Sequence, residues 1–374
     1  VSDSPVARDP RVIRQIQWLT EAGYQVDSLG RGPRPAEING IHYDIPRRSA
    51  LTRVLAYLFL TNRAKYETLI QSQVPSNLIA ATSQGRYDVI VMNEIELLPW
   101  LVAHRLRLLK TEGRVHLDLH EYAPSQRSGV LYLLVFKRWR EYLIAFIGDS
   151  AFDSRSVVAE GIADLYRDKF GFVRPSVIRN CPAYCDLPVR ATNDPIRLVH
   201  HGVASASRGL DILIEAMGYV DERFTLDLML VGARKNLDAL KILAEKVGAK
   251  VRFRDPVDVR VIPETINEYD AEVIFFPPVT QNLRFALPNK FFEAVQARIA
   301  IISGDSIEMR RVIERFNNGV IADGWTAVDL ARAISSLTPS AIDMMKHGSD
   351  QAAHELSSES EKLVFLELIS RENR

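Results

Sequence analysis

The chain has 374 residues, which is too many for one ordinary hydrophobic core and predicts two domains or slightly more. Apolar residues make up 47% and charged residues 25%, proportions that exclude a disordered, collagen-like or disulfide-held chain. Lys+Arg and Asp+Glu both number 47, so the net charge is zero and no nucleic-acid partner is indicated. Two cysteines in such a length fit a reducing compartment.

No apolar run reaches the roughly 18 residues that a membrane-spanning helix needs. Asp3, Arg8 and Asp9 come too early for a secretory signal peptide, and no apolar segment follows them. The first five residues look like the end of a strand, so we treat the start as truncated. These features predict a cytoplasmic protein.

In the first half, short apolar strands alternate with amphipathic helices, the pattern of a parallel sheet covered by helices. A helix is predicted over 11–22, because Val12, Ile16 and Leu19 share one side and Gly23 follows. The strands predicted here are 24–29, 87–92, 114–119 and 143–147.

The second half repeats this alternation, so each half is predicted to be a doubly wound α/β domain. Its predicted strands are 197–201, 226–231, 250–253, 272–276 and 299–302, and its predicted helices 209–219, 236–247 and 288–297. Three prolines within 175–188 are typical of a linker, and a last helix is expected near 355–372. The predicted domains are 1–178 and 179–352, followed by a segment 353–374 that returns to the first domain.

Two segments of the second half carry residues suited to a diphosphate. A strand ends at Gly202, a loop of small residues follows, and Arg208 stands where a helix begins. Further on, Pro288 fits the first turn of a helix. Lys290 and Glu293 lie on one face of this helix, and the Glu293 carboxylate could accept hydrogen bonds from ribose hydroxyls. For the first segment, the alternative is an ordinary loop with a solvated arginine. For the second segment, it is a surface ion pair between Lys290 and Glu293.

Together these segments resemble the C-terminal half of a GT-B glycosyltransferase, most closely family 4 of the retaining enzymes. In that family a Gly-x-x…Lys/Arg-Gly loop and a Pro-Asn-Lys-x-x-Glu-Ala helix start hold the nucleotide sugar. Gly202 and the Arg208-Gly209 pair match the loop, and Asn289, Lys290 and Glu293 match the helix start.

The sequence departs from the family in one carboxylate and matches it elsewhere. In the family, a glutamate eight positions before the residue that matches Glu293 usually contacts the sugar ring. Phe285 stands at that position here, so the resemblance implies that a neighbour such as Asn282 replaces it. Arg254 ends the strand whose backbone binds the base in the family. In the first half, Asp-Leu-His-Glu-Tyr at 118–122 resembles the family's acceptor-side loop and places His120 after a strand. For His120, the alternative is a loop histidine bonded to Asp118 or Glu121.

The resemblance therefore implies a GT-B fold, with two Rossmann-like domains facing across a cleft and a C-terminal helix that crosses back. It implies a retaining hexosyltransferase that moves a sugar from a nucleotide diphosphate donor, UDP-linked by expectation, to a hydroxyl of a glycan, lipid-linked or small-molecule acceptor. A role in cell-surface polysaccharide synthesis follows from the family alone. The implied catalytic residues are His120, Arg208 and Lys290, and the implied donor-binding residues are Gly202, Arg254, Asn282, Asn289 and Glu293.

No metal or other cofactor is expected. Cys181 and Cys185 lack nearby partner ligands for zinc, and His200 and His201 are adjacent on a strand and point to opposite faces. Two other functions share the fold: a nucleotide-sugar 2-epimerase, and a catalytically silent nucleotide-sugar-binding partner. Basic amphipathic stretches at 45–66 and 132–142 could give peripheral contact with the inner membrane face, or could pack on the core.

Overall fold

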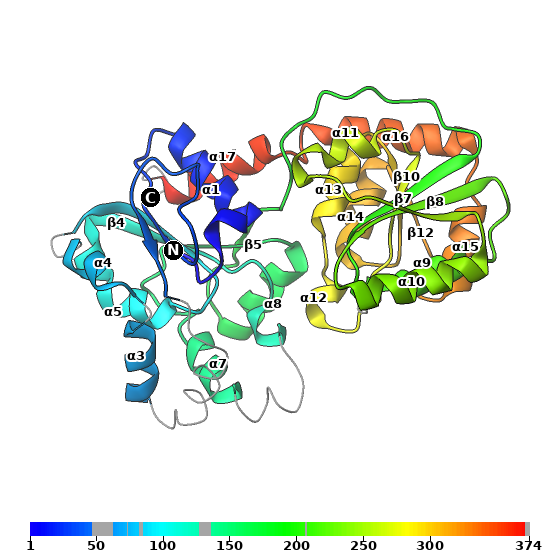
Figure 1. The fold of residues 1–374 in the computed structure, drawn as a ribbon. Coiled ribbons are helices and arrows are strands. Elements are labelled where there is room, and N and C mark those ends of the chain that lie inside the picture. Colours follow the sequence, from blue (N-terminus) through cyan, green and yellow to red (C-terminus); the bar gives the residue numbers. More distant parts are fainter. Residues whose placement is uncertain (47–62, 73, 82–84, 127–135, 206–207, 371–374) are drawn as a thin grey trace. The chain divides into compact units, whose positions relative to one another are not determined.

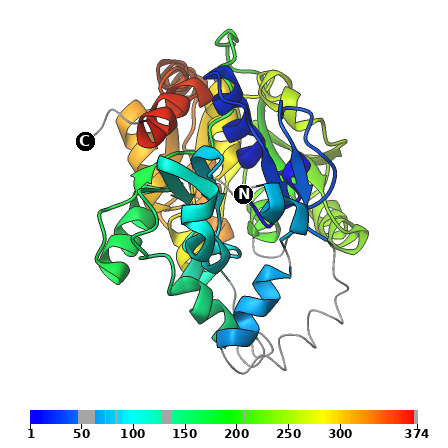
Figure 2. The same cartoon turned by 90° about the vertical axis from the view of Figure 1, so that its left-hand side faces the viewer.

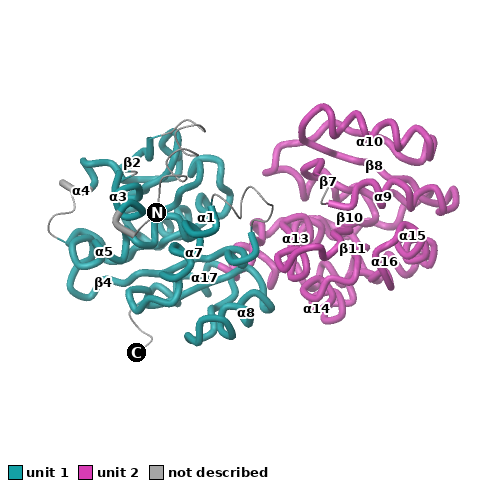
Figure 3. Tube along the Cα trace, turned by 90° about the horizontal axis from the view of Figure 1, so that it is seen from below, with its two compact units in different colours: residues 1–178, 362–374 teal, residues 179–361 magenta. Residues whose placement is uncertain are grey.

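The computed structural model describes residues 1–46, 63–72, 74–81, 85–126, 136–205 and 208–370. The chain forms two compact units (Figure 3). Unit 1 contains residues 1–178 together with 362–374, and unit 2 contains residues 179–361. The last helix, α17 (Ser358–Ile369), therefore starts in unit 2 and ends in unit 1.

Unit 1 is built on a parallel four-stranded sheet. Its order is β3 (Tyr87–Asn93), β4 (Leu109–Asp118), β5 (Ser154–Val157) and β6 (Ser176–Val177), and β1 (Ser28–Gly30) pairs separately with β2 (His42–Asp44). The first residues of the chain join the two sheets. The amide of Asn93 donates to the carbonyl of Val1, and the amide of Ser2 donates to the carbonyl of Leu29.

Two helices pack side by side on one face of the unit 1 sheet, α1 (Pro10–Glu21) and α17 (Figures 1 and 2). Asp9 caps α1 by accepting hydrogen bonds from the amides of Arg11 and Val12, and Pro10 fits its first position. The Trp18 and Phe365 rings lie 5.4 Å apart between the helices. The other described helices of unit 1 are η1 (Val6–Arg8), α3 (Arg63–Gln71), α4 (Ser76–Ala81), α5 (Leu98–Leu108), η2 (Ala123–Ser125), α7 (Lys137–Ile144) and α8 (Glu160–Phe170).

The strand predicted over 143–147 is wrong. Trp139, Arg140 and Leu143 are buried on one side of a helix, α7, and this spacing suits a helical face. The strand that pairs with β4 is β5, whose Ser-Arg-Ser-Val sequence carries too few apolar residues to reveal it. The strand predicted over 24–29 is shorter and later, at β1.

Unit 2 is a six-stranded parallel sheet in the order β12-β11-β10-β7-β8-β9. Its strands are β7 (Ile196–Val203), β8 (Phe224–Val231), β9 (Val251–Arg254), β10 (Ala271–Ile274), β11 (Ala300–Ser303) and β12 (Gly319–Ile321). The five strands predicted for this half are thus confirmed to within a few residues at each end. Such a sheet is doubly wound, because β8 and β9 extend it to one side of β7 while β10, β11 and β12 extend it to the other.

Helices cover both faces of the unit 2 sheet (Figure 1). One face carries α9 (Leu210–Ala216), α10 (Arg234–Val247) and α15 (Ala327–Ser335), and the other carries α13 (Asn289–Gln296), α14 (Ile307–Phe316) and α16 (Pro339–Ala353). Short helices η4 (Val259–Val261), α11 (Ile262–Ile266) and α12 (Gln281–Arg284) complete the unit. Pro288 is the residue that precedes α13 rather than part of its first turn.

The proline-rich stretch predicted as a linker is packed. Its start contributes β6 to unit 1, while Cys181 is fully buried in unit 2 and the Cys185 amide donates to Gln296 Oε1 at 3.0 Å. Proline limits the hydrogen bonds that the backbone donates, but it does not prevent tight side-chain packing.

None of the helices within the described ranges has the length and apolar character needed to cross a bilayer. Most of the two basic amphipathic stretches, residues 47–62 and 132–135, lies outside the described residues.

Candidate functional site

The candidate donor site lies in unit 2, where β7 and β10 are neighbours and the strand order reverses direction. At such a switch point the loops that follow the two strands separate, so that the carboxyl ends of the strands are open to a ligand. Gly202 lies near the carboxyl end of β7, and Phe276 follows β10. The sequence-predicted loop at Gly202 and the helix α13 meet here.

Two glycines allow the close approach of these elements. Gly202 has φ +123°, and a Cβ atom placed there would lie 3.2 Å from Lys290 Nζ. Gly209 has φ +60°, and a Cβ atom there would lie 2.6 Å from the carbonyl oxygen of Phe275. A side chain at Gly209 would therefore clash with the end of β10 and displace the loop that carries Arg208.

Lys290 and Arg208, two of the predicted catalytic residues, lie close together. Lys290 Nζ lies 5.2 Å from the centroid of the Phe276 ring, and the Arg208 guanidinium carbon lies 4.8 Å from the same centroid. Burial and the nearby Arg208 lower the pKa of Lys290 to about 8. Two cationic groups close to one aromatic ring form a positive site of the kind that binds an anion.

Hydrogen bonds hold Lys290 in place through neutral groups. Its Nζ donates to His200 Nε2 at 2.9 Å and to the backbone carbonyl of His201. His200 Nδ1 donates in turn to the carbonyl of Val273 at 2.6 Å, so the imidazole is the neutral Nδ1–H form. Burial, together with Lys290, lowers the pKa of His200 well below its usual value. The ammonium group is therefore held by acceptors that carry no negative charge.

Glu293 is held by His201, a residue on the other face of β7 from His200. His201 Nε2 lies 2.7 Å from Glu293 Oε2, and Nδ1 lies 3.1 Å from Glu272 Oε2. Burial alone would lower the pKa of His201, but the Glu272 and Glu293 carboxylates outweigh it and raise that pKa to about 9. Lys290 and Glu293 are both only 8% exposed, so they do not form the surface ion pair considered as an alternative.

The remaining predicted donor-binding residues lie apart from this cluster or at its edge. Arg254 is half-exposed at the end of β9, where its Nε donates to the buried Asp227 at 2.9 Å. Asn282 is half-buried in α12, and Asn289 is exposed at the first position of α13. Phe285, in place of the family's glutamate, follows α12.

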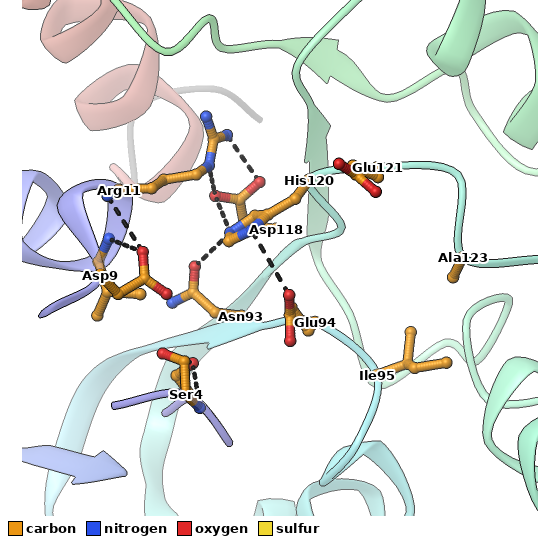
Figure 4. A network of polar contacts seen from close by, with 12 residues as sticks. Ser4, Asp9, Arg11, Asn93, Glu94, Ile95, Asp118, His120, Glu121 and Ala123 are labelled. Atoms are coloured by element: carbon orange, nitrogen blue, oxygen red, sulfur yellow. Dashed lines mark hydrogen bonds and ion pairs between the residues drawn. The ribbon is translucent and has the colours of Figure 1, made fainter. Parts of the chain in front are cut away.

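In unit 1, His120 lies at the carboxyl end of the sheet beside the end of β3 (Figure 4). His120 Nε2 lies 3.0 Å from Asn93 Oδ1 and 3.4 Å from Asp118 Oδ2, and Nδ1 lies 3.9 Å from Glu94 Oε1. His120 has φ +51° and Glu94 has φ +63°, which are left-handed conformations that cost residues other than glycine energy. Such strained residues cluster at functional sites. Asp118 contacts His120, as the alternative expected.

Asp118 anchors this region. Arg11 Nε donates to Asp118 Oδ2 at 2.6 Å, Arg11 Nη2 donates to Oδ1 at 2.8 Å, and Asp118 is fully buried. Burial alone would raise the pKa of Asp118, but Arg11 and His120 lower it well below its usual range. This bidentate pair ties α1 to the end of β4 and orients the backbone that leads to His120.

Glu94 differs from Asp118, because its partner is His120 Nδ1 at 3.9 Å and not a bidentate guanidinium. Burial and the neighbouring Glu96 raise the pKa of Glu94 to about 7, against the opposing effect of His120. Figure 4 shows Asp9, Asn93, Glu94 and His120 pointing toward a common region. Within the described part of the chain, no group of three or more His, Cys, Asp or Glu side chains could hold a metal ion.

Sequence reasoning missed four residues of these two sites. Asn93 ends an apolar strand and Glu94 follows it, and polar residues at that position commonly face a ligand in a parallel α/β sheet. Glu272 is a charged residue inside an otherwise apolar strand, which usually indicates a buried partner. The adjacent His200 and His201 bear in the sequence only on metal binding, whereas the structure places His201 between two carboxylates.

Comparison with known proteins agrees with this architecture. Residues 195–339 match the family model Glycosyl transferases group 1. The structure is similar to sucrose-phosphate synthase from Thermosynechococcus elongatus, with a TM-score of 0.69, 13% identity, and coverage of 95% of this chain and 91% of that chain. It is similar to the E. coli trehalose-6-phosphate structure bound with UDP-2-fluoro glucose (TM-score 0.67, 11% identity, coverage 98% and 97%). No curated protein matches this sequence.

A further similar structure is WaaG, a glycosyltransferase involved in lipopolysaccharide biosynthesis (TM-score 0.63, 13% identity, coverage 99% and 98%). At these identities the structural similarity establishes the fold, which is the GT-B fold predicted from the sequence. The family match covers the part of unit 2 that contains Gly202, Arg208, Lys290 and Glu293. Residues 195–339 are therefore a region of the Glycosyl transferases group 1 type, in a chain that has the GT-B fold.

Proposed function

We propose that the protein transfers a sugar from a nucleotide diphosphate donor to an acceptor hydroxyl, with retention of configuration at the anomeric carbon. The observation that carries this proposal is the pair of cations, Arg208 and Lys290, which both lie close to the Phe276 ring beside Gly202. In this proposal the diphosphate lies against Gly202, which has no side chain to obstruct it, and the two cations face its negative charge.

The cations also account for the chemistry. When the bond from the anomeric carbon to the β-phosphate oxygen breaks, negative charge develops on that phosphate. Lys290, held by His200 and by a backbone carbonyl, stabilises this charge without rearranging. We therefore propose that the reaction needs no metal ion, because two fixed positive groups supply the stabilisation that a divalent cation would otherwise provide.

Retention is proposed from the family resemblance, and the order of bond changes follows from it. The acceptor oxygen forms its new bond on the face from which the phosphate departs, and the phosphate oxygen takes the hydroxyl proton. Such a route needs no carboxylate base. His120 and Asn93, at the ends of β4 and β3, are proposed to bind hydroxyl groups of the sugar or the acceptor.

We propose UDP as the nucleotide, and a glycan, lipid-linked or small-molecule acceptor. The support for UDP is the resemblance to family 4 and the similar E. coli structure bound with UDP-2-fluoro glucose. A cytoplasmic location, with or without peripheral contact to a membrane, belongs to the same proposal.

The first test is thermal stabilisation of the protein by UDP, GDP, ADP and CMP, each with and without EDTA. We expect one diphosphate to raise the melting temperature to the same extent with and without EDTA. Loss of the shift on adding EDTA would contradict the metal-independent site, and no shift with any nucleotide would contradict the donor site itself.

The second test is transfer by Arg208→Ala and Lys290→Ala, assayed with the sugar nucleotide that the first test selects. Each should lower turnover by about 10²–10³-fold, the usual cost of one lost donor to a developing oxyanion. Lys241→Ala is the matched control, since Lys241 Nζ lies 5.8 Å from the Phe253 ring but on an exposed helix. Near-normal turnover in both site variants would contradict the proposal.

His120→Ala separates an enzyme from a silent nucleotide-sugar-binding protein. In an enzyme this variant should keep nucleotide binding, since His120 lies in unit 1, and lose transfer of the sugar. Unchanged transfer would remove His120 from the proposed mechanism.

A further inference from the structure

The donor site of unit 2 contains a buried network that is larger than diphosphate binding requires. Five titratable residues, each at most 8% exposed, are involved: His200, His201, Glu272, Lys290 and Glu293. Three of them come from neighbouring strands and two from α13. Such a concentration of buried ionisable groups is costly unless every charge is compensated.

Charge balance assigns the state of each group. Glu272 and Glu293 are two buried carboxylates, and Lys290 supplies one compensating cation. His200 cannot supply the second, because its Nε2 accepts the hydrogen bond from Lys290. His201 can, since each of its ring nitrogens lies against a carboxylate oxygen. The network is neutral when His201 is an imidazolium.

The geometry makes His201 a rigid link between the two carboxylates. Glu272 accepts from His201 twice, from the backbone amide to Oε1 at 3.3 Å and from Nδ1 to Oε2 at 3.1 Å. With the ring orientation fixed in this way, Nε2–H is directed at Glu293 Oε2, 2.7 Å away. Glu293 Oε1 accepts no hydrogen bond from the described residues, and the Glu293 side chain is the most exposed of the three, at 10%.

We propose that His201, held by Glu272, is a positioning residue that fixes the Glu293 carboxylate so that its second oxygen binds the ribose hydroxyls of the nucleotide. This inference rests on the proposed function and deepens it, because it names the residue that orients Glu293 toward the donor. Lys290 and Arg208 contact the diphosphate in the same scheme, so the two halves of the donor are bound by separable groups.

That separation defines the test. UDP and 2′,3′-dideoxy-UDP carry the same diphosphate and base, so contributions of Lys290 and Arg208 cancel from the ratio of their dissociation constants. The ratio, measured by calorimetry, reports the ribose hydroxyls alone. For the wild-type protein we expect UDP to bind about 10- to 100-fold more tightly, the usual effect of hydrogen bonds to a charged group.

His201→Gln should reduce this ratio to less than about threefold, while binding of inorganic pyrophosphate stays within about twofold of wild type. A purely structural defect would instead weaken UDP, dideoxy-UDP and pyrophosphate together. In the transfer assay the variant should raise KM for the donor more than it lowers kcat, because a ribose contact is made equally before and during reaction. His104→Gln, a histidine bonded to a backbone carbonyl in unit 1, is the control.

Glu272→Gln is the second variant, and it keeps the proposal testable if His201→Gln does not fold. It keeps the shape of the side chain but removes the charge that holds the imidazolium, so it should give a ratio between those of wild type and His201→Gln. A wild-type ratio near one, or a ratio unchanged in the variant that folds, would overturn the role of His201. Failure of wild-type protein to bind UDP, GDP or ADP would instead overturn the proposed function.

Discussion

The two units each bury a cation near the carboxyl ends of their strands, but they compensate it differently. In unit 1 Arg11 donates two hydrogen bonds to the carboxylate of Asp118, so the pair is neutral. In unit 2 Lys290 donates to an imidazole nitrogen and a carbonyl oxygen, which fix its position without forming an ion pair. The first arrangement stabilises a junction between elements, and the second keeps positive charge for an anionic substrate.

The largest effect is expected when the paired cation of unit 1 loses its partner. Asp118→Asn should lower the free energy of unfolding by about 3–5 kcal/mol, because Arg11 is then buried without a compensating charge. Chemical denaturation measures this loss. Asp88→Asn is the control: its partner Lys110 is exposed, so the loss there should stay below about 1 kcal/mol. Equal losses in both variants would show that the buried pair has no special role.

Replacing the cation of unit 2, Lys290, should cost little stability and much activity. Lys290→Met should change the free energy of unfolding by less than about 2 kcal/mol, because the hydrogen bonds of Lys290 go to neutral acceptors and the nearby carboxylates, Glu272 and Glu293, both keep His201 as a partner. Turnover should nevertheless fall by about 10²-fold or more. A loss of stability as large as that of Asp118→Asn would make Lys290 a structural residue and contradict the comparison.

The pH dependence of nucleotide binding tests the same charge. Lys290, with a pKa of about 8 in the free protein, is protonated below that pH and loses its charge above it. The affinity for UDP should therefore be greatest below pH 8 and should fall by up to about tenfold per pH unit above it. Titration calorimetry between pH 7 and 9 measures this slope. In Lys290→Gln the slope should flatten, and a slope that persists there would assign the effect to another group.

The smallest effect concerns Glu94 of unit 1, whose pKa burial raises. Its pKa is raised to about 7, so the folded protein holds a proton that the unfolded chain releases, and stability falls as pH rises from about 4.5 to 7. Glu94→Gln removes this penalty and should raise stability at pH 8 by about 1 kcal/mol, a value reduced for the exposure of the side chain. At pH 4 the two proteins should melt alike. A destabilised variant at pH 8 would show that the Glu94 charge is used by the fold.

Most of the architecture could be predicted from the sequence. Apolar periodicity is a local property of the sequence. It predicts the alternation of strands and helices in unit 2, the helix α1 and the strand β3. The prediction failed where polar composition concealed a strand, at β5, and where a run of apolar residues belonged to a helix, at α7. Burial against the rest of unit 1 determines both elements, and local propensity does not contain that information.

The candidate site divides in the same way. Gly202, Arg208, Lys290 and Glu293 were recognisable because each lies in a short motif whose residue types and spacing are local. Their partners were not recognisable, because His201 is separated from Glu272 by 71 positions and from Glu293 by 92, and Arg11 is separated from Asp118 by 107. Which charges become paired, and which are held by neutral acceptors and remain available to a substrate, depends on contacts between distant residues that exist only after the sheets have formed.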